Sequence, residues 1–77
     1  MPVPPMIPVQ STSIAAVGYE PARKALYLRF HESRRTYRYA GVPDRVYRKL
    51  MAAESKGRFV NAVIKPNYPC TRIRGAG

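Results

Sequence analysis

The sequence predicts an α+β domain, a three-stranded antiparallel meander with two short helices packed on one face. Over residues 14–40 β-branched and aromatic residues recur at alternating positions, a pattern typical of strands, and two polar breaks interrupt them. From residue 42 to residue 64 the apolar period lengthens to about 3.6 residues, which indicates helices. Seventy-seven residues suffice for one small domain with a single thin core.

The first hairpin is predicted from the loop Pro21–Lys24, which separates strands expected over residues 14–20 and 25–31. This loop places Glu20 opposite Ala25. Three further pairs then share one apolar face, namely Tyr19–Leu26, Val17–Leu28 and Ala15–Phe30. Three others share the opposite face, namely Gly18–Tyr27, Ala16–Arg29 and Ile14–His31.

The second hairpin is predicted to turn at Ser33-Arg34 and to lead into a strand over residues 35–40. On the apolar face it places Phe30 opposite Tyr37 and Leu28 opposite Tyr39. On the other face it places His31 opposite Thr36 and Arg29 opposite Arg38. Both hairpins therefore predict the same core face, and both helices are expected to cover it.

The first helix is expected to begin at Pro43 and to end near Glu54. Proline is tolerated at the first helical position because an amide hydrogen there has no acceptor within the helix. Ser55 is a candidate cap for a second helix, and Gly57 is free to adopt a positive φ at the sharp junction. Pro66 is expected to stop that helix. The two apolar stripes consist of Val46, Tyr47, Leu50 and Met51, and of Phe59, Val60, Val63 and Ile64.

Both ends of the chain are expected to be flexible tails. The first 19 residues carry no charged side chain, but four prolines within the first eight residues rule out a continuous helix and no basic leader is present. We therefore expect a cytoplasmic protein with no membrane contact. The predicted organisation is a proline-rich tail over residues 1–11, a domain over 12–69 and a C-terminal tail over 70–77. The segment from Met6 to Val9 is expected to become ordered only against an apolar groove or strand edge.

Charge and composition favour a binding module over an enzyme. Fourteen Lys and Arg residues against four Asp and Glu residues give a net charge of +10, which favours a polyanionic or acidic partner. A single Cys and a single His exclude an internal disulfide and a Cys- or His-rich metal site. We find no nucleophile beside a base, no paired carboxylates and no glycine-rich phosphate loop. We expect no catalytic residue, no metal and no cofactor.

Two groups of residues are candidate nucleic-acid-binding sites. Tyr27, Arg29 and Arg38 share the uncovered face of the predicted sheet, where a ring can stack on bases and guanidinium groups can bind phosphates; the alternative is a solvated face that keeps the sheet soluble. Lys56, Arg58, Asn61 and Lys65 gather at the corner between the two helices, where backbone amides can also bind phosphate. The alternative there is that Gly57 only ends a helix and Asn61 only satisfies backbone groups.

Four groups of residues together form a recognisable pattern over about residues 12–69. They are Ser13-Ile14 through Val17-Gly18-Tyr19, Tyr37-Arg38-Tyr39, Val42-Pro43 with Val46-Tyr47 and Leu50, and Ser55-Lys56-Gly57-Arg58-Phe59 with Asn61, Ile64, Lys65 and Tyr68. In these residues the chain resembles the KTSC domain, a small domain found at the C-terminus of some lysyl-tRNA synthetases and as a stand-alone bacterial protein. The family is of unknown function, and its company with a synthetase implies RNA binding.

We therefore expect a small non-enzymatic module that binds RNA or another polyanion, with the corner between the helices slightly favoured over the sheet face. The alternative is a protein-interaction module that docks an acidic surface of a larger partner in the transcription or translation machinery. The uncharged strand Ser13–Gly18 is an edge that can pair with a second copy or with the Met6–Val9 tail, so a monomer or a weak homodimer is expected.

Overall fold

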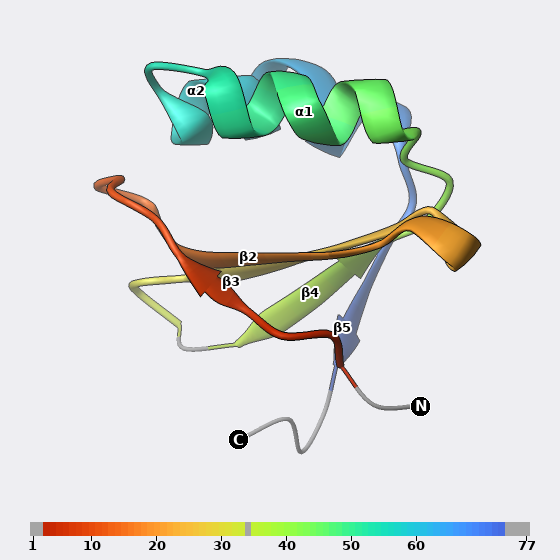
Figure 1. Cartoon of the computed structure of the whole chain (residues 1–77). Coiled ribbons are helices and arrows are strands. Elements are labelled where there is room, and N and C mark those ends of the chain that lie inside the picture. The colour runs from red at the N-terminus through yellow and green to blue at the C-terminus, as the bar shows by residue number, and fades with distance from the viewer. Residues whose placement is uncertain (1–2, 34, 74–77) are drawn as a thin grey trace.

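The computed structural model describes residues 3–33 and 35–73 and confirms the α+β class. The helices of residues 44–67 lie on one face of a five-stranded antiparallel sheet with the order β1-β2-β3-β4-β5, and a short helical turn at residues 21–23 connects two strands at the end of the sheet (Figure 1). The strands are β1 (Ile7–Pro8), β2 (Ile14–Glu20), β3 (Ala25–Phe30), β4 (Thr36–Tyr39) and β5 (Cys70–Ile73). The helices are η1 (Pro21–Arg23), α1 (Asp44–Ala52), α2 (Lys56–Phe59), the π-helical η2 (Val60–Ile64) and α3 (Lys65–Asn67).

The prediction of three strands is wrong, because each expected tail contributes one more strand. Ile7 pairs with Val17 on the outer edge of β2, and Tyr39 pairs with Cys70 on the outer edge of β4. Strands of two and four residues leave almost no periodic signal, and Pro8 is tolerated because β1 lies at the sheet edge. This edge was expected to pair with a second copy or with the Met6–Val9 tail, and the second alternative is confirmed, because residues 7–8 pair with β2.

The strand register agrees with the prediction near the first loop and departs from it beyond. The pairs from Glu20–Ala25 to Ala16–Arg29 are as expected, but a bulge between Ile14 and Ala16 pairs Ile14 with Phe30 instead of His31. In the second hairpin Leu28 pairs with Tyr37, Leu26 with Tyr39, Arg29 with Thr36 and Tyr27 with Arg38. This register is shifted by two residues from the predicted one, so the side chains of the second hairpin keep their predicted faces. Ile14 does not, because the bulge in β2 turns it into the core. Arg34, in the predicted turn, lies outside the described residues.

The junction between the helices is capped as predicted, but glycine has a different role there. The Ser55 hydroxyl accepts a hydrogen bond from the Arg58 amide at 3.4 Å. Gly57 is helical, and the positive φ falls instead on Gly41, at 77°. A Cβ atom on Gly57 would stand 3.0 Å from the Ser13 hydroxyl oxygen. Glycine at position 57 thus accommodates the close approach of α2 to Ser13, which lies just before β2.

Pro66 does not stop the second helix, contrary to the prediction. The helical run continues from α2 through the π-helical η2 and passes Pro66 to end at Asn67. Proline lacks an amide hydrogen and crowds the carbonyl four residues earlier, and a wider π turn relieves that crowding. The Lys65 amide accordingly donates to the Val60 carbonyl, five residues back. Asn61 and Lys65 therefore belong to one helical run.

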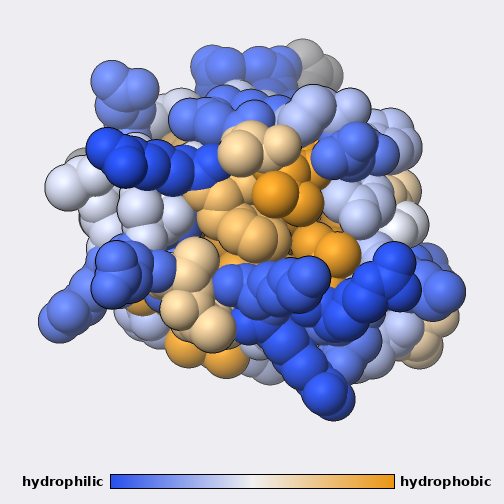
Figure 2. Space-filling model, turned by 90° about the horizontal axis from the view of Figure 1, so that it is seen from above, coloured by the Kyte–Doolittle hydropathy of each residue, from blue (hydrophilic) through white to orange (hydrophobic). Residues whose placement is uncertain are grey.

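The core lies between the helices and the sheet. Its buried members are Ile14, Val17, Leu26, Leu28, Tyr39, Val42, Val46, Leu50, Val60 and Ile64. Phe30, Tyr37, Phe59 and Val63, also predicted to be core residues, are only partly buried. The outer surface of the helix layer carries an apolar patch among hydrophilic residues (Figure 2). In the described part of the chain, no helix has the length and apolar character needed to cross a bilayer.

Candidate functional site

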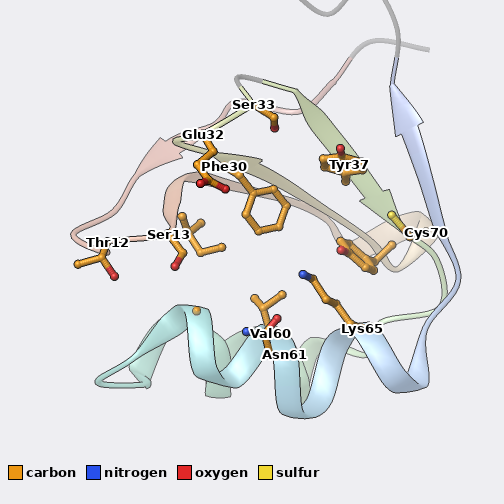
Figure 3. Close-up of a pocket in the computed structure, with 13 residues that line it drawn as sticks. Thr12, Ser13, Phe30, Glu32, Ser33, Tyr37, Val60, Asn61, Lys65 and Cys70 are labelled. Carbon is orange, nitrogen blue, oxygen red and sulfur yellow. The ribbon is translucent and has the colours of Figure 1, made fainter.

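A cleft of about 760 Å³ opens between the sheet and the helical run α2–η2–α3 (Figure 3). One wall comes from the core face of the sheet and the opposite wall comes from the helices. The lining residues are Thr12, Ser13, Ile14, Phe30, Glu32, Ser33, Tyr37, Tyr39, Gly57, Val60, Asn61, Lys65 and Cys70. This volume is typical of sites that hold a small molecule or one group of a larger ligand.

The sheet wall of the cleft is aromatic. Phe30 and Tyr37 contact each other edge to face, with ring centroids 5.6 Å apart and planes at 67°. Both rings are partly buried, so they retain surface for a ligand. Tyr39 is buried deeper, and burial together with a hydrogen bond to Cys70 raises the pKa of its phenol well above the usual range. The Tyr39 hydroxyl therefore stays protonated near neutral pH.

The helix wall of the cleft is polar and cationic. Asn61 and Lys65 both line it, from successive turns of the helical run, and both are exposed. The Lys65 ammonium nitrogen lies 5.5 Å from the centroid of the Phe30 ring. At this distance a cation is attracted to the ring face, so Lys65 is held at the aromatic wall. The ammonium group is thus close enough to the ring to meet a phosphate carried by a ligand that binds there.

The remaining wall of the cleft includes a carboxylate. Glu32 and Ser33 line it from the loop between β3 and β4. Ion pairs engage two other acidic residues, Glu20 with Arg23 at 3.2 Å and Asp44 with Arg48 at 2.7 Å. Within residues 3–33 and 35–73, Glu32 forms no ion pair.

Sequence reasoning missed several lining residues for two different reasons. It assigned Phe30 and Tyr37 to the core, it treated Ser33 only as part of a turn, and it did not single out Glu32. No local signal indicated that Glu32 and Ser33 would line the same cleft as the helical run, because that arrangement depends on helix packing. Cys70 was assigned to a tail, and the pairing of β5 with β4 brings it to the cleft.

The predicted corner site is only partly assembled. Asn61 and Lys65 line the cleft, whereas Lys56 and Arg58 lie outside its lining. The Lys56 ammonium donates to the Ala53 carbonyl at 3.2 Å, and the Arg58 side chain is exposed. The Arg58 amide is already bound by Ser55, so this backbone donor is not free for a phosphate.

The predicted sheet-face site loses its aromatic member. Tyr27 is only 5% exposed, which prevents its ring from stacking on a base. Its cross-strand partner Gly18 lies against residues 4–6 of the N-terminal segment, which cover this face of the sheet. Arg29 and Arg38 are half-buried, and the Arg29 Nε atom donates to the Thr36 hydroxyl at 3.4 Å. The predicted flat aromatic platform is thus corrected to a covered face.

The cleft is suited to binding through contact and charge. It combines partly exposed rings, one amide, one ammonium group, one carboxylate and several hydroxyls. Among the described residues, no three His, Cys, Asp or Glu side chains are grouped so that they could hold a metal ion. A ligand with a flat ring, polar ring edges and a negative group matches this set of side chains.

Comparisons with known proteins agree on one family. The sequence profile of the KTSC domain matches residues 10–68. A protein of Tsukamurella paurometabola is 51% identical over 63 residues, covering 82% of this chain and 92% of the relative. An uncharacterised protein of Stutzerimonas stutzeri is 39% identical over 62 residues, covering 80% and 86% of the two chains. The crystal structure of a KTSC domain protein from Yersinia pestis aligns with a TM-score of 0.85 at 42% identity, covering 90% of this chain and 96% of that chain.

Proposed function

The chain belongs to the KTSC domain family, and we propose that this member binds single-stranded RNA in the cleft without catalysing a reaction. One observation carries the proposal: partly exposed aromatic rings face Asn61 and Lys65 across a cleft in a protein of net charge +10. Proteins that recognise unpaired RNA commonly stack splayed bases on aromatic rings and read their edges with polar side chains.

Shape favours a single strand over a duplex. The rings of Phe30 and Tyr37 lie inside a cleft rather than on a flat face, so a base must leave its helical stack to reach them. Unpaired bases do this at little cost, whereas paired bases must first be separated. We therefore expect duplex RNA to compete weakly.

Charge supplies the affinity that does not depend on sequence. Lys65 lies at the cleft, and Arg58 is exposed near the beginning of the same helical run. Lys56 is anchored by Ala53 but keeps its positive charge near Arg58. These three cations mark a path along the helices for the phosphates that flank the bound base.

The test is a titration of a short, fluorescently labelled single-stranded RNA at increasing salt concentration. Three phosphate contacts, one for each cation of this path, predict a slope of about −2 in a plot of log affinity against log salt, since each contributes about −0.7 for a single strand. Lys65→Met keeps the stem length, removes one charge and should flatten the slope by about 0.7. Lys49→Met, at an exposed site outside the cleft lining, is the matched control and should leave the slope unchanged.

A second candidate function follows from the outer surface of the helix layer. Its apolar patch lies among hydrophilic residues (Figure 2). Arg45 and Lys49 of α1 are exposed. This combination suits an acidic protein surface with apolar side chains. Lack of RNA binding at low salt would contradict the RNA proposal and favour this partner.

A further inference from the structure

We infer that the cleft selects guanine among the four RNA bases and that Glu32 is the residue that reads it. This inference rests on the proposed function and adds a specificity to it. The observation behind it is a carboxylate that lines the cleft of a strongly basic protein (Figure 3).

The position of Glu32 is unfavourable for phosphate binding alone. A carboxylate repels the phosphates that Lys65 attracts, so it lowers the affinity of any polyanion that offers it no hydrogen-bond donor. Within the described residues, Glu32 has no cationic partner that would neutralise it, unlike Glu20 and Asp44. A ligand that presents donors at this point converts the repulsion into a charge-assisted hydrogen bond.

Guanine is the base whose donors match a carboxylate. An ionised carboxylate only accepts hydrogen bonds, and its two oxygens accommodate two parallel N–H groups. The Watson–Crick edge of guanine presents N1–H and N2–H side by side, the same fork that a guanidinium group presents. Adenine and cytosine each place a ring acceptor beside their amine, and uracil has one N–H between two carbonyls. Only guanine therefore engages both oxygens of Glu32.

The neighbours of Glu32 fit the rest of the same base. In the view of Figure 3 the Phe30 ring lies between the Glu32 carboxylate and the Lys65 ammonium group. The Lys65 ammonium group lies over the face of this ring, so a base that stacks there displaces it. The base would then turn its edge toward Glu32, and its phosphate would meet the displaced ammonium group. The Ser33 hydroxyl accepts from the Arg35 amide at 3.3 Å and keeps its own hydrogen, which can be donated to guanine O6.

The test compares uridine-rich RNAs of one length that differ only at the central nucleotide. Guanine, adenine, cytosine, uracil and inosine are placed there in turn, because inosine retains N1–H and O6 but lacks the N2 amine. We expect guanine to bind about tenfold more tightly than adenine, cytosine or uracil, as for other bidentate contacts to a base, with inosine between them. Equal affinity for all five RNAs would overturn this inference and leave the proposed function standing, whereas no binding to any of them would contradict the proposed function itself.

Two variants locate the selectivity. Glu32→Gln keeps the shape of the side chain but replaces one acceptor oxygen with a donor, so the preference for guanine should fall to about twofold or less. Glu54→Gln makes the same charge change at an exposed residue outside the cleft lining and should keep the preference. Retention of the full preference in Glu32→Gln would refute the role of Glu32. Because Glu32 is exposed, its replacement is not expected to disturb the fold, and a circular dichroism spectrum checks this.

Competition with free guanosine monophosphate tests whether the cleft binds a guanine within RNA or a free guanine nucleotide. We expect it to displace the RNA only at concentrations at least a hundredfold higher, because it lacks the flanking phosphates that the basic path binds. Competition at equal concentration would overturn the assignment to RNA and identify a free guanine nucleotide as the ligand.

Discussion

Met6 lies so close to Gly18 that a Cβ atom on the glycine would stand 2.7 Å from the Met6 sulfur. The same atom would lie 3.2 Å from the Pro5 carbonyl oxygen. The absence of a side chain at position 18 thus lets the N-terminal segment cross the middle of β2. That crossing covers Tyr27, the cross-strand partner of Gly18, and closes the face that a basic aromatic platform would have needed.

Gly18→Ala should loosen the N-terminal segment. Overpacking of this kind costs about 1–3 kcal/mol, and the Met6 side chain must move to make room. We expect a lower free energy of unfolding and faster hydrogen exchange at the Val9 amide, which donates to the Ala15 carbonyl at 3.2 Å. Met6→Ala in the same chain should recover part of the loss. Unchanged exchange at Val9 in Gly18→Ala would show that the segment does not depend on this contact.

Gly57→Ala should push the helical run away from the beginning of β2. Its Cβ atom would stand 3.0 Å from the Ser13 hydroxyl oxygen and 3.2 Å from the Ser13 Cβ atom. Because both Gly57 and Ser13 line the cleft, we expect weaker binding of single-stranded RNA together with reduced stability. Ser13→Gly removes the colliding atoms and should restore both properties in the double variant. Full RNA affinity in Gly57→Ala alone would show that RNA binding does not depend on the contact between Gly57 and Ser13.

Tyr39 should make stability decline at high pH. Its pKa is raised in the folded protein by burial and by the hydrogen bond to Cys70, so the unfolded chain loses the phenol proton first, at its ordinary pKa of about 10. The contribution to stability is complete below pH 10 and falls as the pH rises above that value. Denaturant unfolding between about pH 8 and pH 11 measures this fall.

Tyr39→Phe is the variant that checks the assignment, because it removes the titrating group. The decline in its free energy of unfolding should be smaller than in the wild type. It should not vanish, since burial and the charge of Asp44 also raise the pKa of Tyr19. An identical decline in both proteins would contradict the role of Tyr39.

Leu50→Ala should destabilise the whole domain, because Leu50 is completely buried between α1 and the sheet. A cavity of this kind costs about 2–5 kcal/mol, which a chemical denaturation midpoint measures directly. Lys49→Ala, at the exposed neighbouring position, should cost less than about 0.5 kcal/mol. Equal losses in the two variants would contradict the observed orientation of α1.

Periodicity predicted the face of almost every side chain. The alternation in β2 and β3 identified Val17, Leu26 and Leu28 as core residues, and all three are buried. The second hairpin kept the predicted faces even though its register is shifted by two residues, because an even shift preserves the side of the sheet. The cap at Ser55 was equally predictable, since it needs only a hydroxyl three residues before the Arg58 amide.

The candidate site was only half predictable. Asn61 and Lys65 were recognised from sequence, whereas the carboxylate of Glu32 and the partly exposed rings of Phe30 and Tyr37 were not. The predicted stacking residue, Tyr27, proved to be covered. A side chain becomes a lining residue only when an element distant in the chain lies opposite it, and no local pattern carries that information.

The sequence by itself determined the class of each main element, the buried face of the sheet and helices, and the net positive charge. Tertiary structure alone decided that β1 and β5 join the sheet edges, that a π turn carries the helix past Pro66, and that a cleft opens beside Lys65. The physical reason is the distance along the sequence over which each interaction acts. Periodicity and helix caps depend on residues a few positions apart. The pairing of a strand edge and the packing of the core depend on elements that are far apart in the chain.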